Sequence, residues 1–189
     1  AVGVDSPLSE QSSDTIVGGK DAYIGDVPWQ IALRVNGQQF CGGSILNEEW
    51  VLTAQHCTEA VGGMTMQVVA GVTRQSDTGG QTRDVAQVYP YPGFSSPISG
   101  KDVSLLRLST LVDLNGSTTA AIELVDDQDV ASGVTDAGVM ALVSGWGILD
   151  EQGWQSPDVL QSAEVPIIDL AAAQNAYAQY VNTIDVDQI

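Results

Sequence analysis

The chain has 189 residues, 43% of them hydrophobic, and carries a formal net charge of −18. Six basic residues against 24 acidic ones create a negative field that repels phosphate backbones and anionic lipids, so neither nucleic acid nor a membrane is an expected partner. No hydrophobic run is long enough to span a bilayer, which predicts a soluble globular protein with a sizeable core.

The acidic residues form their tightest group at Asp126, Asp127 and Asp129. We interpret them as a solvated surface, with adaptation to salty surroundings as the alternative.

The first 15 residues read AVGVDSPLSEQSSDT, a polar and acidic stretch with few large apolar side chains. Such a composition is typical of a mobile leader, not of a core element. The basic and apolar segments of a secretion signal do not precede it, so we expect that an export signal has been removed or left out. Residues 1–15 are therefore predicted to be a leader.

From residue 28 onward, short apolar runs of strand length alternate with turn residues, a pattern typical of all-β barrels and sandwiches. Asn36-Gly37 is a strong signal for a two-residue hairpin turn, because both residues tolerate positive φ. The segments on either side should pair antiparallel. Up to residue 108 the strand candidates are residues 28–35, 38–46, 51–57, 64–71, 82–90 and 102–108. Together they predict one closed barrel.

The second half begins with a polar linker at residues 109–118. Three more strand candidates follow at residues 120–125, 138–147 and 159–168, and the alanine-rich segment 171–181 favours a short helix. Three strands cannot close a barrel. Residues 119–189 are therefore predicted to be the first part of a second barrel in a truncated chain.

Cys41 and Cys57 are the two cysteines of the chain. They are too few for a disulfide-built scaffold and lack the companions that a zinc site would need. A single disulfide is the simplest use, and it would stabilise the fold by about 3 kcal/mol by closing a loop of about 15 residues. Because disulfides persist in oxidising compartments, we expect a secreted protein, extracellular or periplasmic.

His56 and Asp102 are the candidate catalytic residues. A single histidine is more often structural, but His56 lies at the end of the predicted strand 51–57, beside a cysteine whose disulfide would fix its backbone. Asp102 opens the segment 102–108 and by itself would be a turn residue. As a pair they can act as a general base and the carboxylate that orients it and stabilises the imidazolium ion.

Five motifs, IVGGKDAYIGDVPWQ, CGGSIL, LTAQHC, DVSLLRL and SGWG, stand in an order that resembles the chymotrypsin and trypsin-like serine proteases. The resemblance covers residues 16–189. It implies an all-β fold of two antiparallel six-stranded β-barrels, the second incomplete here, with His56 and Asp102 from the first barrel (16–108) in the cleft between them. The implied function is a serine endopeptidase that cleaves protein or peptide substrates with no cofactor or metal.

The family carries its nucleophile in a Gly-Asp-Ser-Gly-Gly stretch after SGWG, and this sequence contains no such stretch. Ser44 and Ser144 fall in strand motifs, so we interpret both as structural. The serine is expected beyond Ile189, which would leave this fragment inactive. A C-terminal segment carried as a separate chain is one further expected partner. The selectivity pocket and the donors that hold the oxyanion would lie in the same missing segment, so specificity stays open.

Ile16 opens IVGG, which in the family becomes a new amino terminus that inserts beside the nucleophile. The resemblance thus implies a partner protease that cleaves before Ile16, although an ordinary leader-to-strand junction is the simpler alternative. Two glycines, Gly18 and Gly19, would give the freed segment the backbone freedom to insert. Thr15 precedes the junction, and this does not support a trypsin-like activator.

A second departure from the family pattern, after Thr15, lies beside His56. Gln55 stands where the family usually has a small alanine before the histidine, so the packing around His56 is expected to differ from that of the family. The loop that binds calcium in some family members contains a single carboxylate here, Asp77, so no calcium site is expected.

The main alternative function is a non-catalytic homologue that acts as a binding module. A third, an acidic β-rich adhesion module, does not account for LTAQHC together with DVSLLRL.

Overall fold

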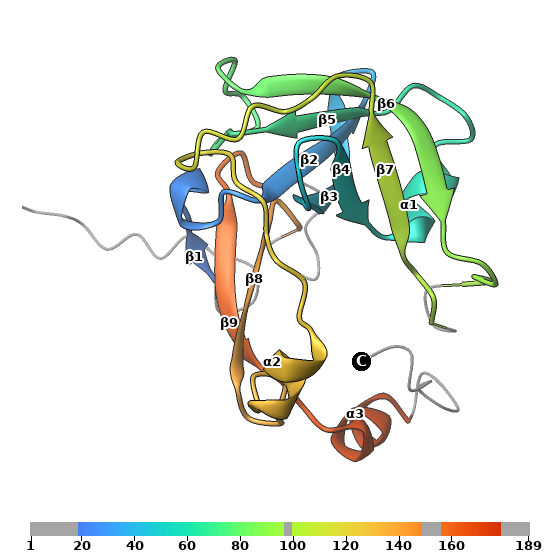
Figure 1. Ribbon diagram of the computed structural model, residues 1–189, viewed down its shortest axis with the longest axis vertical. Coiled ribbons are helices and arrows are strands. Elements are labelled where there is room, and N and C mark those ends of the chain that lie inside the picture. Colours follow the sequence, from blue (N-terminus) through green and yellow to red (C-terminus); the bar gives the residue numbers. More distant parts are fainter. Residues whose placement is uncertain (1–18, 97–99, 149–155, 179–189) are drawn as a thin grey trace, which may run out of the picture.

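The computed structural model describes residues 19–96, 100–148 and 156–178. These residues form a closed antiparallel barrel and, beside it, a three-stranded sheet (Figure 1). Helices are few and short, so the all-β class predicted from the sequence is confirmed. None of the helices in the described part has the length and apolar character needed to cross a membrane.

The barrel has the strand order β2-β3-β4-β7-β6-β5 and closes through the pairing of β2 with β5. Each of the six strands predicted before residue 109 is present, although the one predicted at residues 51–57 ends earlier, at Thr53. Asn36 and Gly37 have φ values of 52° and 78°, so the predicted hairpin turn is confirmed between β2 and β3. The strand bounds are β2 (Gln30–Val35), β3 (Gln38–Ile45), β4 (Trp50–Thr53), β5 (Gln67–Ala70), β6 (Gln81–Pro90) and β7 (Ser104–Leu108).

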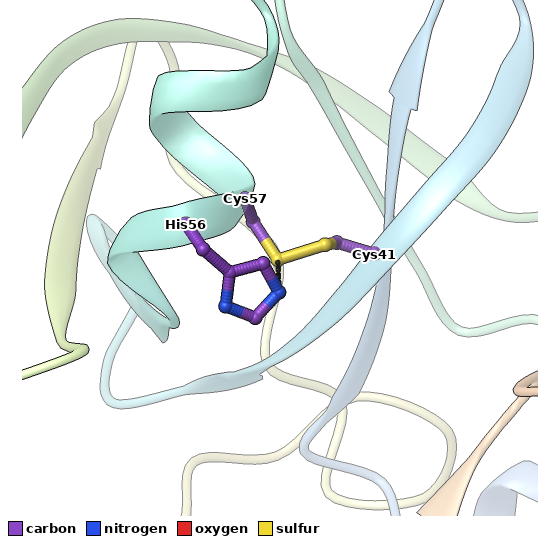
Figure 2. Close-up of side chains that lie close together, drawn as sticks. All are labelled: Cys41, His56 and Cys57. Carbon is purple, nitrogen blue, oxygen red and sulfur yellow. Dashed lines mark hydrogen bonds between the residues drawn. A yellow bond between two sulfur atoms is a disulfide. The ribbon is translucent and has the colours of Figure 1, made fainter. Parts of the chain in front are cut away.

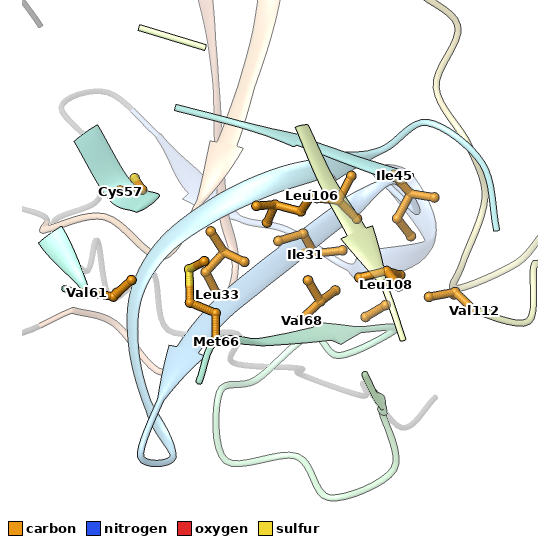
Figure 3. Close-up of a cluster of buried hydrophobic side chains, with 12 residues drawn as sticks. Ile31, Leu33, Ile45, Cys57, Val61, Met66, Val68, Leu106, Leu108 and Val112 are labelled. Carbon is orange, nitrogen blue, oxygen red and sulfur yellow. The ribbon is translucent and has the colours of Figure 1, made fainter. Parts of the chain in front are cut away.

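The barrel interior is filled by aliphatic side chains from alternating strand positions (Figure 3). Along β7, for example, Ser104, Leu106 and Leu108 are buried and the residues between them are not. Full burial of such side chains stabilises the fold by about 1.5–3 kcal/mol each. The side chains with 0% exposed surface include Ile31, Leu33, Ile45, Val51, Val68 and Leu106. This packed interior gives the strand ends, where the site lies, a rigid base.

A second apolar cluster joins the outer face of the barrel to the three-stranded sheet. Ala32 of β2 and Val69 of β5 pack there with Trp146 and Leu160, which flank the second sheet. The Trp146 indole N–H also donates to the Thr73 carbonyl at 3.3 Å. Trp146 is therefore a core aromatic, and the cluster explains why the three-stranded sheet stays docked on the barrel.

The second sheet has the strand order β1-β9-β8. β8 (Met140–Gly145) and β9 (Gln161–Pro166) lie in the predicted segments, and α3 (Leu170–Tyr177) lies in the segment predicted to be helical. The strand predicted at residues 120–125 is wrong. That segment makes isolated backbone bonds to two different partners, from Ala120 to Pro28 and from Ile122 to Ile45, and it leaves Leu124 63% exposed. Without a continuous ladder it does not become a strand.

Three short elements differ from the sequence prediction or were missed by it. Residues 16–108 were assigned to the first barrel, but β1 (Lys20–Asp21) pairs with β9 of the second sheet. The acidic group is exposed, as predicted, but it also starts a helix, α2 (Asp127–Ala131), in which Asp126 and Asp129 form a reciprocal capping box. A single 3-10 turn, η1 (Ile24–Asp26), precedes β2. Elements this short carry no readable periodicity.

Candidate functional site

His56 lies on a helix, not at the end of a strand. β4 ends at Thr53, Ala54 has an extended backbone, and α1 (Gln55–Ala60) begins directly after it. Thr53 pairs with Ser104, the first residue of β7, so the ladder between these strands has no further partner beyond that point. The chain therefore leaves the barrel rim and turns into α1, which places His56 above the start of β7.

Asp102 binds His56 at two points, one with each carboxylate oxygen. The backbone N–H of His56 donates to Oδ1 at 2.8 Å, and the ring atom Nδ1 lies 2.6 Å from Oδ2. A carboxylate can only accept, so Nδ1 carries the shared proton and donates it to Oδ2. The structure thus brings together the two residues that the sequence paired, from positions 46 apart in the chain.

The Asp102 carboxyl is ionised at neutral pH. Burial by itself raises its pKa, but hydrogen bonds from the His56 ring and amide, the charge of His56 and the Gln55 amide together outweigh burial. The net effect lowers the pKa of Asp102 from the ordinary value of 3.8. The side chain of Asp102 is 20% exposed and that of His56 is 50% exposed, so the imidazole stays open to solvent on its far side. Asp102 therefore offers a permanent negative charge to an accessible imidazole.

A disulfide between Cys41 of β3 and Cys57 of α1 lies against the imidazole (Figure 2). This pairing confirms the predicted bridge and fixes the backbone next to His56. The ring atom Nε2 lies 3.4 Å from the Cys57 sulfur. That sulfur carries no proton, so the contact leaves the Nε2 lone pair able to accept one. The same three side chains are the only metal-ligand cluster found in the described residues, but both sulfurs are bonded to each other and offer no thiolate.

Gln55, the first residue of α1, does not disturb the pair of His56 and Asp102. Only 6% of the surface of this residue is exposed, and its side-chain amide N–H donates to Glu59 Oε1 at 3.0 Å. The other end of the amide, Oε1, is buried without a partner. Such an atom costs about 1–3 kcal/mol. The departure from alanine thus affects stability more than the geometry of His56 and Asp102.

A cavity of about 590 Å³ opens between β3 and the end of β8. Ser44 and Ser144 line it from the two sides, and the Ser144 hydroxyl donates to Gln30 Oε1 at 2.7 Å. Within the described part of the chain, the imidazole of His56 contacts Asp102 and the Cys57 sulfur, and it bonds neither serine. This arrangement is consistent with the structural role expected for both serines.

Residues 16–188 match the sequence model of the Trypsin family. The chain belongs to this family. It is similar to trypsin I-P38 of Gallus gallus, with 31% identity over 178 residues that cover 93% of this chain and 67% of the relative. It is also similar to serine protease 1 of Rattus norvegicus (32% over 178 residues, 93% and 68% covered) and to coagulation factor IX of Cavia porcellus (35% over 161 residues, 82% and 54% covered).

This trypsin-family chain spans about two thirds of the length of the first two relatives and about half of the third. The family is one of serine proteases, which act on proteins. Ile16 and the leader of residues 1–15 lie outside the described residues, which begin at Gly19. The expected role of Ile16 therefore stays a prediction.

Lys101, directly before Asp102, has an unfavourable backbone conformation. Its φ of 62° lies in the left-handed region, and its carbonyl accepts from the Val103 amide at 2.9 Å across a tight turn around Asp102. Asparagine tolerates this region better than lysine does. We expect Lys101→Asn to raise the free energy of unfolding by about 0.5–1 kcal/mol in urea denaturation. Lys20→Asn, in the exposed strand β1, is the control that removes the same charge. A Lys101→Asn chain no more stable than this control would contradict the prediction.

Proposed function

We propose that the protein from which this chain comes is a serine endopeptidase, with His56 as its general base and Asp102 as the residue that orients it. The observation that carries the proposal is the two-point binding of His56 by an ionised Asp102. It holds the ring with Nδ1 protonated and Nε2 as the acceptor. That tautomer is the one a base needs to remove a proton from a serine hydroxyl.

The proposed reaction is acyl transfer through a covalent intermediate. His56 Nε2 takes the proton of the serine hydroxyl as its oxygen attacks the peptide carbonyl, and then delivers this proton to the leaving amine. Asp102 stabilises the imidazolium ion between the two steps, because the developing positive charge lies next to its carboxylate. We place the serine and the oxyanion donors in a segment that is not among these 189 residues, since the sequence contains no Gly-Asp-Ser-Gly-Gly stretch.

The remaining parts of the proposal concern processing and location. We infer that residues 1–15 are an activation leader, removed by another protease so that Ile16 becomes the new terminus. We also infer a secreted protein, which the Cys41–Cys57 disulfide supports, and protein or peptide substrates. We propose the same division of the chain as the sequence predicts, a first barrel at residues 16–108, a linker at 109–118 and the first part of a second barrel at 119–189, except that β1 pairs with β9 of the second sheet.

Covalent labelling of the full-length protein with a fluorophosphonate tests the proposal. We expect one labelled serine, and we expect labelling to be lost in His56→Ala, because the hydroxyl then has no base. The purified 189-residue chain should neither become labelled nor hydrolyse peptide or ester substrates. If the folded, processed full-length protein is not labelled, it is a non-catalytic binding module and the proposal is wrong.

A further inference from the structure

A second side-chain contact joins α1 to β7, next to the pair of His56 and Asp102. The hydroxyl oxygens of Thr58 and Ser104 lie 3.2 Å apart, and Ser104 is almost fully buried, with 1% of its surface exposed. Both contacts span 46 residues of sequence, because each partner of the second lies two positions after its counterpart in the first. The helix that carries His56 is thus tied to β7 by two neighbouring contacts.

The direction of these hydrogen bonds follows from the number of protons available. The Thr58 hydroxyl donates to the Gln55 carbonyl at 2.8 Å. A hydroxyl has a single proton, so the Thr58 oxygen can only accept from Ser104. The result is a hydroxyl relay, defined here as Ser104 O–H to Thr58 O–H to the Gln55 carbonyl. Consecutive hydrogen bonds polarise one another and strengthen the chain.

The relay connects a rigid position to an element that needs support. Ser104 pairs with Thr53 of β4 on one side and with Pro90 of β6 on the other, so the barrel holds its backbone from both sides. At the other end, α1 has only six residues. A helix this short is not stable by itself. Its Gln55 residue, which accepts the last bond of the relay, directly precedes His56.

We propose that Thr58 and Ser104 are positioning residues that hold the first turn of α1 on β7 and thereby keep the His56 imidazole on the Asp102 carboxylate. This inference rests on the proposed function, because it assigns the relay to the support of a general base. The two hydroxyls bond each other and the Gln55 carbonyl, not the imidazole, so the effect passes through the backbone of α1.

The test uses the fact that His56 is the only histidine of the 189-residue chain. The NMR signal of its Nδ1 proton is therefore unambiguous, and its line width reports how often the proton leaves Asp102 and exchanges with water. We expect Thr58→Val and Ser104→Ala each to speed this exchange by about three- to tenfold, the weight of one net hydrogen bond. Thr58→Ser keeps the hydroxyl and should restore slow exchange.

Thr119→Val is the matched control. Thr119 is also 1% exposed and donates its hydroxyl proton to the Asp113 carbonyl at 2.7 Å, in the connection between the barrel and the second sheet. Its loss should lower stability and leave the His56 signal unchanged. Equal exchange in Thr58→Val and the wild type would overturn the inference, and so would an equal acceleration in the control. If Ser104→Ala does not fold, the comparison of Thr58→Val with Thr58→Ser decides, because Thr58 is only partly buried.

In the full-length enzyme, Thr58→Val and Ser104→Ala should each lower kcat by about three- to tenfold and leave KM unchanged. This readout separates the two proposals. A normal kcat in Thr58→Val, with serine labelling intact, would overturn the positioning role alone. Absence of serine labelling in the wild type would overturn the proposed function, while the NMR comparison would still decide whether the relay holds His56 on Asp102.

Discussion

Asp102→Asn in the full-length protein is expected to lower kcat by about 10⁴-fold, the loss that the same substitution causes in a well-characterised Ser-His-Asp triad. The structure gives the reason. One oxygen must still accept from the His56 amide, so the asparagine carbonyl takes the place of Oδ1. Its NH₂ group then faces Nδ1, where Oδ2 stood. A donor at that position forces the ring proton onto Nε2, and the base can no longer accept.

The measurement is steady-state hydrolysis of a peptide substrate by the purified enzyme, with kcat and KM determined separately. KM should change little, because neither atom of the carboxylate is expected to touch the substrate. Asp158→Asn is the matched control. This carboxylate also has a lowered pKa, caused first by the Ser76 amide and then by the Ser76 hydroxyl and Arg74, but it caps a turn away from His56. A loss in Asp102→Asn no larger than in Asp158→Asn would contradict the proposed role.

Removal of the disulfide by the double substitution Cys41→Ala and Cys57→Ala should lower the free energy of unfolding by about 3 kcal/mol. The bridge joins residues 16 apart, so its loss returns the entropy of a loop of that size to the unfolded chain. Cys57 is also 4% exposed, and its truncation adds a small packing loss. The measurement is urea or guanidinium denaturation of both chains at neutral pH.

Reduction provides the control for the disulfide prediction. Dithiothreitol should destabilise the wild-type chain by a similar amount and should leave the double variant unchanged, since the variant has no bond to reduce. A destabilisation of the variant below about 1 kcal/mol would mean that the bridge adds little to the fold, outside the usual range for such bonds.

Much of the barrel could be predicted because its strands follow rules that act over neighbouring residues. Alternating burial, as along β7, marks one face of a strand for the interior. Asn36-Gly37 specifies the turn between β2 and β3 through the positive φ of both residues. Such local preferences need no knowledge of the rest of the chain. For the same reason the two strands β8 and β9 and the helix α3 were found at nearly their observed places.

The errors arose where a partner distant in sequence decides the outcome. Residues 120–125 have the composition of a strand, but no neighbouring strand offers them a ladder. β1 is too short to be recognised, and it exists only because β9 pairs with it. His56 lies on α1 because the ladder between β4 and β7 stops at Thr53. The Thr58–Ser104 contact could not be anticipated either, because hydroxyl groups carry no signal of their partners.

The β-rich class, the disulfide and the candidate pair of His56 and Asp102 could be read from the amino-acid order, since they depend on residue types, local patterns and a recognisable order of motifs. The folded chain alone shows that both oxygens of Asp102 bind His56 and that the Thr58 and Ser104 hydroxyls join α1 to β7. Hydrogen bonds depend on distance and direction between atoms, and closure of the barrel brings these atoms together. No local preference along the chain specifies them.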